Sequence, residues 1–138
     1  MKTKLLSALL VGMLFTVSIF ANDPETTTYS NIQNTETGSV KEFTTFSKST
    51  NEPMQKSTYR YDLAGNIQEK VVYKWNGDKG WVGAQKLEYK YNETATDRPV
   101  GINFSEWDSK KNDWTAKQKS ITFEYKTDGS SAVDVKAN

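Results

Sequence analysis

The sequence contains no cysteine and no histidine among its 138 residues. Without histidine, Ser-His-Asp triads and Cys-His dyads cannot be assembled, and without either residue the usual zinc sites are excluded. The absence of cysteine also excludes disulfides and a lipid anchor on a cleavage-site cysteine. These absences remove most hydrolase mechanisms, so we expect a non-enzymatic protein that folds by packing alone, with no metal or other cofactor.

The amino-terminal segment has the layout of a secretory signal peptide. Lys2 and Lys4 give a positive start, an apolar run covers residues 5–20, and Ala21 offers a small residue for cleavage. The run is shorter than the roughly 20 residues that a membrane-spanning helix needs. We therefore predict that residues 1–21 are cleaved, that no membrane anchor remains, and that the protein is exported to the periplasm or secreted.

The chain carries little net charge. Its 18 basic and 17 acidic residues give a formal net charge of +1, and the two signs are interspersed. A nucleic-acid-binding protein usually shows a basic stripe or patch, and a protein of the membrane surface a basic amphipathic helix. The sequence shows neither feature, so we expect neither nucleic acid nor membrane as a partner.

The rest of the chain divides into a polar leader and one β domain. Residues 22–37 are rich in Thr and Asn and lack an apolar period, which predicts a disordered leader. An irregular edge strand beginning near Tyr29 is the alternative. From Val40 onward, runs rich in β-branched and aromatic residues alternate with Gly, Asn and Asp clusters, a pattern typical of strands and turns. We therefore predict an all-β domain over residues 38–138.

One block occurs three times within this domain, beginning at Gln55, Gln85 and Gln118. A spacing of about 30 residues indicates a repeated supersecondary unit, here a β-hairpin whose return strand carries the block. We predict an antiparallel meander of about seven strands, either a twisted open sheet or a partly closed barrel. Apolar residues should share one face and charged residues the other. The expected apolar face includes Trp81, Leu87 and Tyr89.

Four tryptophans bracket two of the predicted turns and are the candidate ligand-binding residues: Trp75, Trp81, Trp107 and Trp114. Aromatic rings can stack on sugars, and they also fill the space between pleated strands. Trp75 and Trp107 are the best candidates for an exposed rim. We predict a cell-envelope module that binds a glycan or a protein partner through this rim or through an open sheet edge.

Two other functions stay open. Paired carboxylates could act as a histidine-free glycan hydrolase if two of them face each other away from lysine; the candidates are Glu69, Glu88, Glu106, Asp108 and Glu124. A solvated charged face explains the same residues without catalysis. The third function is a structural component of a surface assembly, and the sequence leaves the oligomeric state undetermined. Acidic turn residues match no calcium-loop spacing, so no metal site is expected.

Two family resemblances accompany these patterns. The segment Tyr-Arg-Tyr-Asp-Leu-Ala-Gly-Asn-Ile at residues 59–67 resembles one YD (Rhs-type) repeat. The signal peptide, joined to hairpins of the type seen at residues 73–77 and 87–91, resembles the small exported Bacteroidetes family catalogued as domain of unknown function 3836. This second resemblance covers nearly the whole chain. It implies a periplasmic or secreted β protein of no known activity, so no functional residues can be carried over.

Overall fold

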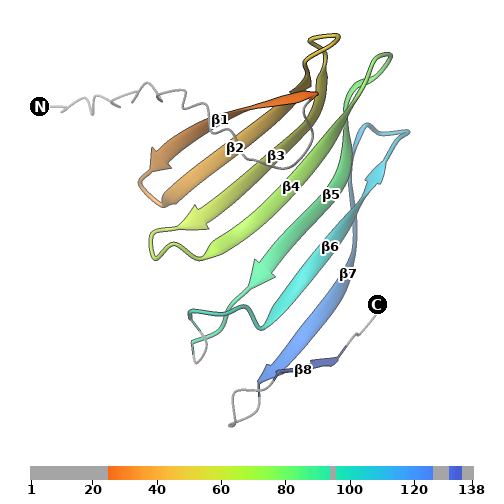
Figure 1. Cartoon of the computed structure of the whole chain (residues 1–138). Helices are drawn as coiled ribbons and strands as arrows, with labels where there is room; N and C mark the ends of the chain where they lie inside the picture. Colours follow the sequence, from red (N-terminus) through yellow and green to blue (C-terminus); the bar gives the residue numbers. More distant parts are fainter. Residues whose placement is uncertain (1–24, 94–95, 126–130, 135–138) are drawn as a thin grey trace, which may run out of the picture.

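The computed structural model describes residues 25–93, 96–125 and, for the backbone alone, 131–134. The predicted signal peptide lies outside these residues. The described chain forms one antiparallel sheet whose strands follow one another in chain order (Figure 1). The strands are β1 (Thr26–Thr35), β2 (Gly38–Ser47), β3 (Pro53–Asp62), β4 (Ile67–Asn76), β5 (Gly80–Lys90), β6 (Gly101–Asp108), β7 (Asp113–Tyr125) and β8 (Ser131–Asp134).

The predicted all-β antiparallel meander is confirmed, and the sheet is open. β1 and β8 stand at the two ends of the strand order, and the described residues of β1 pair with β2 alone. The described part of the chain contains no helix long and apolar enough to cross a membrane.

The segment predicted to be a disordered leader supplies the first strand, so the prediction is wrong for residues 26–35. β1 pairs with β2 without interruption from Thr26↔Ser47 to Thr35↔Gly38. The hydroxyl of Thr35 donates a hydrogen bond to the Gly38 carbonyl (3.2 Å) across the short turn. Threonine, tyrosine and isoleucine fit a pleated strand, but without an apolar face they give little sequence signal. The alternative of an edge strand near Tyr29 describes this segment better.

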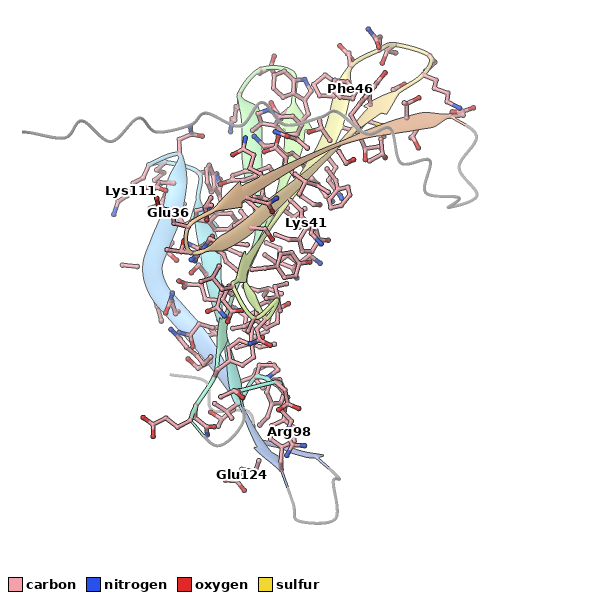
Figure 2. All side chains as sticks on the ribbon, turned by 90° about the vertical axis from the view of Figure 1, so that its left-hand side faces the viewer. Glu36, Lys41, Phe46, Arg98, Lys111 and Glu124 are labelled. Atoms are coloured by element: carbon pink, nitrogen blue, oxygen red, sulfur yellow. The ribbon has the colours of Figure 1, made fainter. Side chains whose placement is uncertain are left out.

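The sheet is a single layer without a second layer packed on it in the described chain. Figure 2 shows it edge-on, with side chains projecting on both sides. Val71 and Leu87 are the only buried apolar residues among those described, and each keeps 8% of its surface exposed. Most domains bury one face of a sheet against another layer. Here stability must come mainly from the strand ladders and from side-chain pairs across neighbouring strands.

One side of the sheet, the tyrosine face, carries the aromatic residues of the repeated block. Directly opposed partners in antiparallel strands lie on the same face, and the tyrosine face comprises Phe43, Tyr59, Lys70, Leu87, Tyr89, Ile102, Phe104 and Ile121. Lysine side chains cover some of its rings. Lys41 lies 4.7 Å from the ring centre of Tyr61, and Lys70 lies 5.7 Å from that of Tyr59.

The tryptophans lie on the opposite side, which we call the tryptophan face. The β4–β5 register shifts between Val72↔Gln85 and Tyr73↔Gly83, so Ala84 is an extra residue in β5. Because side chains alternate with period two, one extra residue reverses the face of everything beyond it. Trp81 therefore pairs with Trp75 and does not share a face with Leu87, which corrects the expected apolar face. Each face mixes apolar and charged side chains.

The β3–β4 turn is held by the carboxylate of Asp62. It accepts hydrogen bonds from the Asn66 backbone N–H (2.9 Å), the Asn66 side-chain amide (3.3 Å) and the Gln68 amide (3.0 Å). The backbone bond from Asn66 lowers the pKa of Asp62 below its ordinary value of 3.8, despite an opposing effect of desolvation. The folded state therefore favours the ionised form of this carboxyl group.

We expect stability to fall as the pH drops below about 4. A carboxyl whose pKa is lower in the folded than in the unfolded chain contributes stability above the unfolded value. That contribution is lost as the pH falls through the folded value. Urea unfolding measured between about pH 5 and pH 2 should show a smaller decrease in the free energy of unfolding for Asp62→Asn than for the wild type. The variant should still lose the contribution of Glu106 at acid pH, because a hydrogen bond from Lys119 lowers the pKa of that carboxyl group. An unchanged acid loss in Asp62→Asn would contradict this assignment.

Candidate functional site

The two tryptophan-bracketed turns lie at the same end of the sheet (Figure 1). Both are built around a side-chain oxygen that accepts two backbone hydrogen bonds. Asn76 Oδ1 accepts from the N–H groups of Asp78 (3.1 Å) and Lys79 (3.0 Å). Asp108 Oδ1 accepts from the second and third residues after it, at 2.9 and 3.3 Å. Such local bonds make Asn and Asp strong turn formers, and here they fix the strand ends that carry the tryptophans.

Five aromatic residues of the tryptophan face, which we call the aromatic cluster, lie at this end and make two sets of ring contacts. Trp75 contacts Trp81, and Tyr73, Trp107 and Trp114 contact one another. Trp75 and Trp81 meet edge-to-face with ring centres 5.2 Å apart, and Trp107 and Trp114 do the same at 5.1 Å. Tyr73 joins the second pair, because its ring lies 6.1 Å from Trp107 and 5.9 Å from Trp114. Its hydroxyl also accepts a hydrogen bond from the Trp114 indole N–H (3.3 Å). Edge-to-face pairs of this kind are the preferred aromatic geometry.

Gly83 makes room for the cluster on the backbone of β5. A Cβ atom at this position would overlap Trp107 and lie 2.7 Å from two ring atoms of Trp114. Glycine inside a strand commonly marks such a close approach of another group to the backbone. The indoles of the β6–β7 hairpin therefore rest against the β4–β5 hairpin and join the two units on this face.

A lysine from the neighbouring hairpin adds positive charge to the cluster. Lys56, in β3, lies 5.4 Å from the ring centre of Tyr73 and 5.1 Å from that of Trp81. Aromatic faces attract cations electrostatically, so this contact holds the lysine in place over the rings.

A pocket of about 260 Å³ opens where the two hairpins separate. β5 and β6 pair from Lys86↔Ser105 to Lys90↔Gly101 but not beyond towards the tryptophan end. The space between their ends is lined by Lys74, Trp75, Asn76, Lys79, Val82, Trp107, Ser109 and Asn112. It combines two indoles with amide, hydroxyl and ammonium groups. Its volume lies near the lower end of ligand pockets, which suits a single ring or a chain end.

All four candidate tryptophans lie at the same end of the tryptophan face, in two contacting pairs, and none of them is buried. Trp75 is the most exposed, with 37% of its surface accessible, and it lines the pocket together with Trp107. Trp81 and Trp114 are half-buried partners that hold these two rings. Sequence reasoning missed Tyr73 and Gly83. An isolated glycine inside a strand pattern was the available signal for Gly83.

Beside the aromatic cluster, the tryptophan face also carries a polar ladder across β3–β7. Glu69 contacts Arg60 (3.6 Å) and Lys86 (3.5 Å). Glu88 lies directly opposite Glu69 and accepts a hydrogen bond from the Gln118 amide. From Gln118 the hydrogen bonds continue through Asn103 to Ser120 and also reach Ser105.

This ladder bears on the hydrolase alternative. Glu69 and Glu88 are opposed, as a carboxylate pair requires, but Glu69 lies between an arginine and a lysine. The condition that both carboxylates stand away from lysine is therefore not met. Glu106 is paired with Lys119. The described residues contain no group of three or more acidic side chains that could hold a metal ion.

Comparison with known proteins adds a family but no activity. No curated protein and no solved structure shows significant similarity to this chain. A family model described as a family of unknown function, DUF3836, matches residues 1–124. The match spans the strands that build the aromatic cluster, and it agrees with the resemblance seen in the sequence. The chain belongs to the family of unknown function DUF3836.

Proposed function

We propose that this protein is an exported, non-enzymatic module that binds a glycan at the pocket between the two tryptophan-bracketed hairpins. The observation that carries the proposal is that Trp75 and Trp107, from different hairpins, line one pocket. A pyranose ring has an apolar face of C–H groups that can lie on an indole, while its hydroxyl groups need hydrogen-bond partners. Asn76, Ser109 and Asn112 lie around the same pocket and offer such partners.

The exposure of Trp75 supports binding at this pocket. Trp75 keeps 37% of its surface accessible and lines the pocket, so part of its ring can be reached by a ligand. The cluster also holds its rings before any ligand arrives, through edge-to-face contacts and the bond between Trp114 and Tyr73. A preorganised site loses less conformational entropy on binding than a flexible one.

A glycan array followed by titration of tryptophan fluorescence tests the proposal. The wild-type protein should bind at least one oligosaccharide class from cell envelopes or host surfaces, with a change in fluorescence. Trp75→Ala and Trp107→Ala should each weaken binding by roughly tenfold or more, the range of an aromatic hot spot.

Tyr29→Ala is the matched control. Tyr29 is also an exposed aromatic residue, with 45% of its surface accessible, but it lies on β1 in contact with Phe46 and outside the pocket. Its loss should leave the glycan affinity unchanged. Absence of binding by the wild-type protein across the array, or equal losses in all three variants, would contradict a glycan site at this pocket.

A further inference from the structure

The pocket between the two tryptophan-bracketed hairpins is lined by two lysines and, among the described residues, by no acidic side chain. Lys74 lies in β4 and Lys79 in the β4–β5 turn, and both are exposed. Within the described part of the chain, neither ammonium group forms an ion pair or lies over an aromatic ring. Other lysines of the sheet have such partners: Lys86 contacts Glu69 at 3.5 Å, and Lys56 lies over two rings. The pocket therefore has two positive charges in its lining that no neighbouring carboxylate neutralises.

The acidic residues of the two turns do not supply the missing negative charge. Asp108 accepts two backbone hydrogen bonds within its own turn, at 2.9 and 3.3 Å, and Asp113 accepts one from the Trp114 N–H at 2.7 Å. Asp78 is exposed on the β4–β5 turn and, like the other two, does not line the pocket. The lining of the pocket therefore stays positive.

The lysines and the indoles approach the pocket from different faces of the sheet. The pocket lies where β5 and β6 are no longer paired, so side chains of both faces reach it. Lys74 pairs with Gln55 and Val82 on the tyrosine face. Trp75 and Trp107 belong to the tryptophan face. A ring placed in this gap can lie on an indole while a substituent at its edge meets an ammonium group.

The remaining polar groups of the pocket favour a ligand that accepts hydrogen bonds. Asn76 Oδ1 is occupied by the backbone N–H groups of Asp78 (3.1 Å) and Lys79 (3.0 Å). Its amide NH₂ is therefore the part of this side chain left for a ligand, and an ammonium group can only donate. Ser109 and Asn112 can donate or accept. A carboxylate, with two oxygens that only accept, matches this set of donors.

We propose that the pocket selects an acidic sugar, a hexuronate or a sialate, whose carboxylate pairs with Lys74 and Lys79 while its ring lies on Trp75 or Trp107. This inference rests on the proposed glycan function and names the class of sugar that the site takes. The volume of about 260 Å³ suits one such ring. A neutral sugar would leave both ammonium groups without an ionic partner, so charge complementarity separates the two classes.

Titration of tryptophan fluorescence with acidic oligosaccharides and their carboxyl-reduced counterparts tests this selection. The panel holds hexuronate and sialate oligosaccharides. Reduction converts each carboxylate to a neutral hydroxymethyl group and leaves the ring and the linkage unchanged. At least one acidic member should bind the wild-type protein, and its reduced counterpart should bind roughly tenfold more weakly, the range of a lost charge-assisted hydrogen bond. This difference should shrink as the salt concentration rises from about 50 to about 500 mM, because salt screens exposed charges.

Two lysine variants and a matched control locate the charge that is recognised. Lys74→Gln and Lys79→Gln should each weaken binding of the acidic member by roughly fivefold or more and leave the affinity for its reduced counterpart unchanged. Lys111→Gln removes the same charge from the β6–β7 turn, at an exposed residue outside the pocket lining. It should leave both affinities within about twofold of the wild type, because a charge away from the ligand is screened.

The outcomes distinguish this inference from the proposed function. Equal binding of acidic and reduced members, both weakened by Trp75→Ala, overturns the selection of acidic sugars and leaves the glycan site in place. Equal losses in all three lysine variants overturn it as well, because the ligand would then respond to the general charge of this end of the sheet. A protein that binds neutral glycans on the array but no acidic member has the opposite selectivity. Absence of binding to any glycan overturns both proposals.

Discussion

Gly83→Ala should destabilise the protein by about 1–3 kcal/mol and weaken glycan binding with it. Alanine normally stabilises a strand relative to glycine, so the expected sign is opposite to the ordinary propensity effect. The reason is the contact of Trp107 and Trp114 with the β5 backbone, where the added methyl group has no space. The indoles must move away, which separates the two hairpins beside the pocket.

Urea unfolding followed by circular dichroism measures the stability, and the near-ultraviolet signal of the tryptophans reports the cluster. Gly77→Ala is the control, because no atom lies within 4 Å of the Cβ that it would add in the β4–β5 turn. It should change the free energy of unfolding by no more than about 0.5 kcal/mol. A Gly83→Ala protein of wild-type stability with an unchanged tryptophan signal would show that the two hairpins are not packed together in this way.

Gly38→Ala should have the largest effect of any single methyl group, about 3 kcal/mol or more. Gly38 is buried at the start of β2, with a φ of +146° that side-chain-bearing residues rarely adopt. Its added Cβ would overlap the Tyr61 carbonyl oxygen and lie 2.9 Å from the carbonyl carbon of Asp62. These are backbone atoms of β3, so no side-chain rotation relieves the overlap.

Because Gly38 pairs with both Thr35 and Asp62, its displacement should loosen β1 and β2 together. Gly65→Ala separates the effect of backbone strain from the effect of overlap with β3. Gly65 also has a positive φ, +86°, but no atom lies within 4 Å of the Cβ that alanine would add there. It should cost only roughly 1–2 kcal/mol. Equal losses in the two variants would mean that backbone strain, and not the overlap with β3, dominates at Gly38.

The class of fold and the order of its strands could be predicted from local patterns. The hairpin units around the Gln-Lys blocks and the Asn and Asp turns need only short-range information, because turn chemistry acts within a few residues. The meander follows from short turns, since neighbouring strands joined in this way must be antiparallel. The position of the tryptophans beside the turns was visible for the same reason.

The faces of the strands could not be predicted in the same way. Ala84 adds one residue to β5, and this reverses Trp81 relative to Leu87. The third block is one residue longer between Gln118 and Tyr125 than the second is between Gln85 and Tyr91. Gln118 accordingly lies on the tryptophan face opposite Ser105, whereas Gln85 lies opposite Val72 on the tyrosine face. One extra residue decides on which face the later side chains of a strand lie. Only the pairing with the neighbouring strand shows where that extra residue is located.

By itself, the sequence determined an all-β hairpin meander without cysteine or histidine chemistry, because composition and turn signals are local properties. The tertiary structure alone decided that Trp75 and Trp107 share a pocket and that β1 forms one edge of the sheet. It also decided that the sheet has a single layer in the described chain. These features depend on register, bulges and contacts between hairpins. Their energies arise from residues far apart in the chain, such as Gly83 and Trp114, which no local pattern brings together.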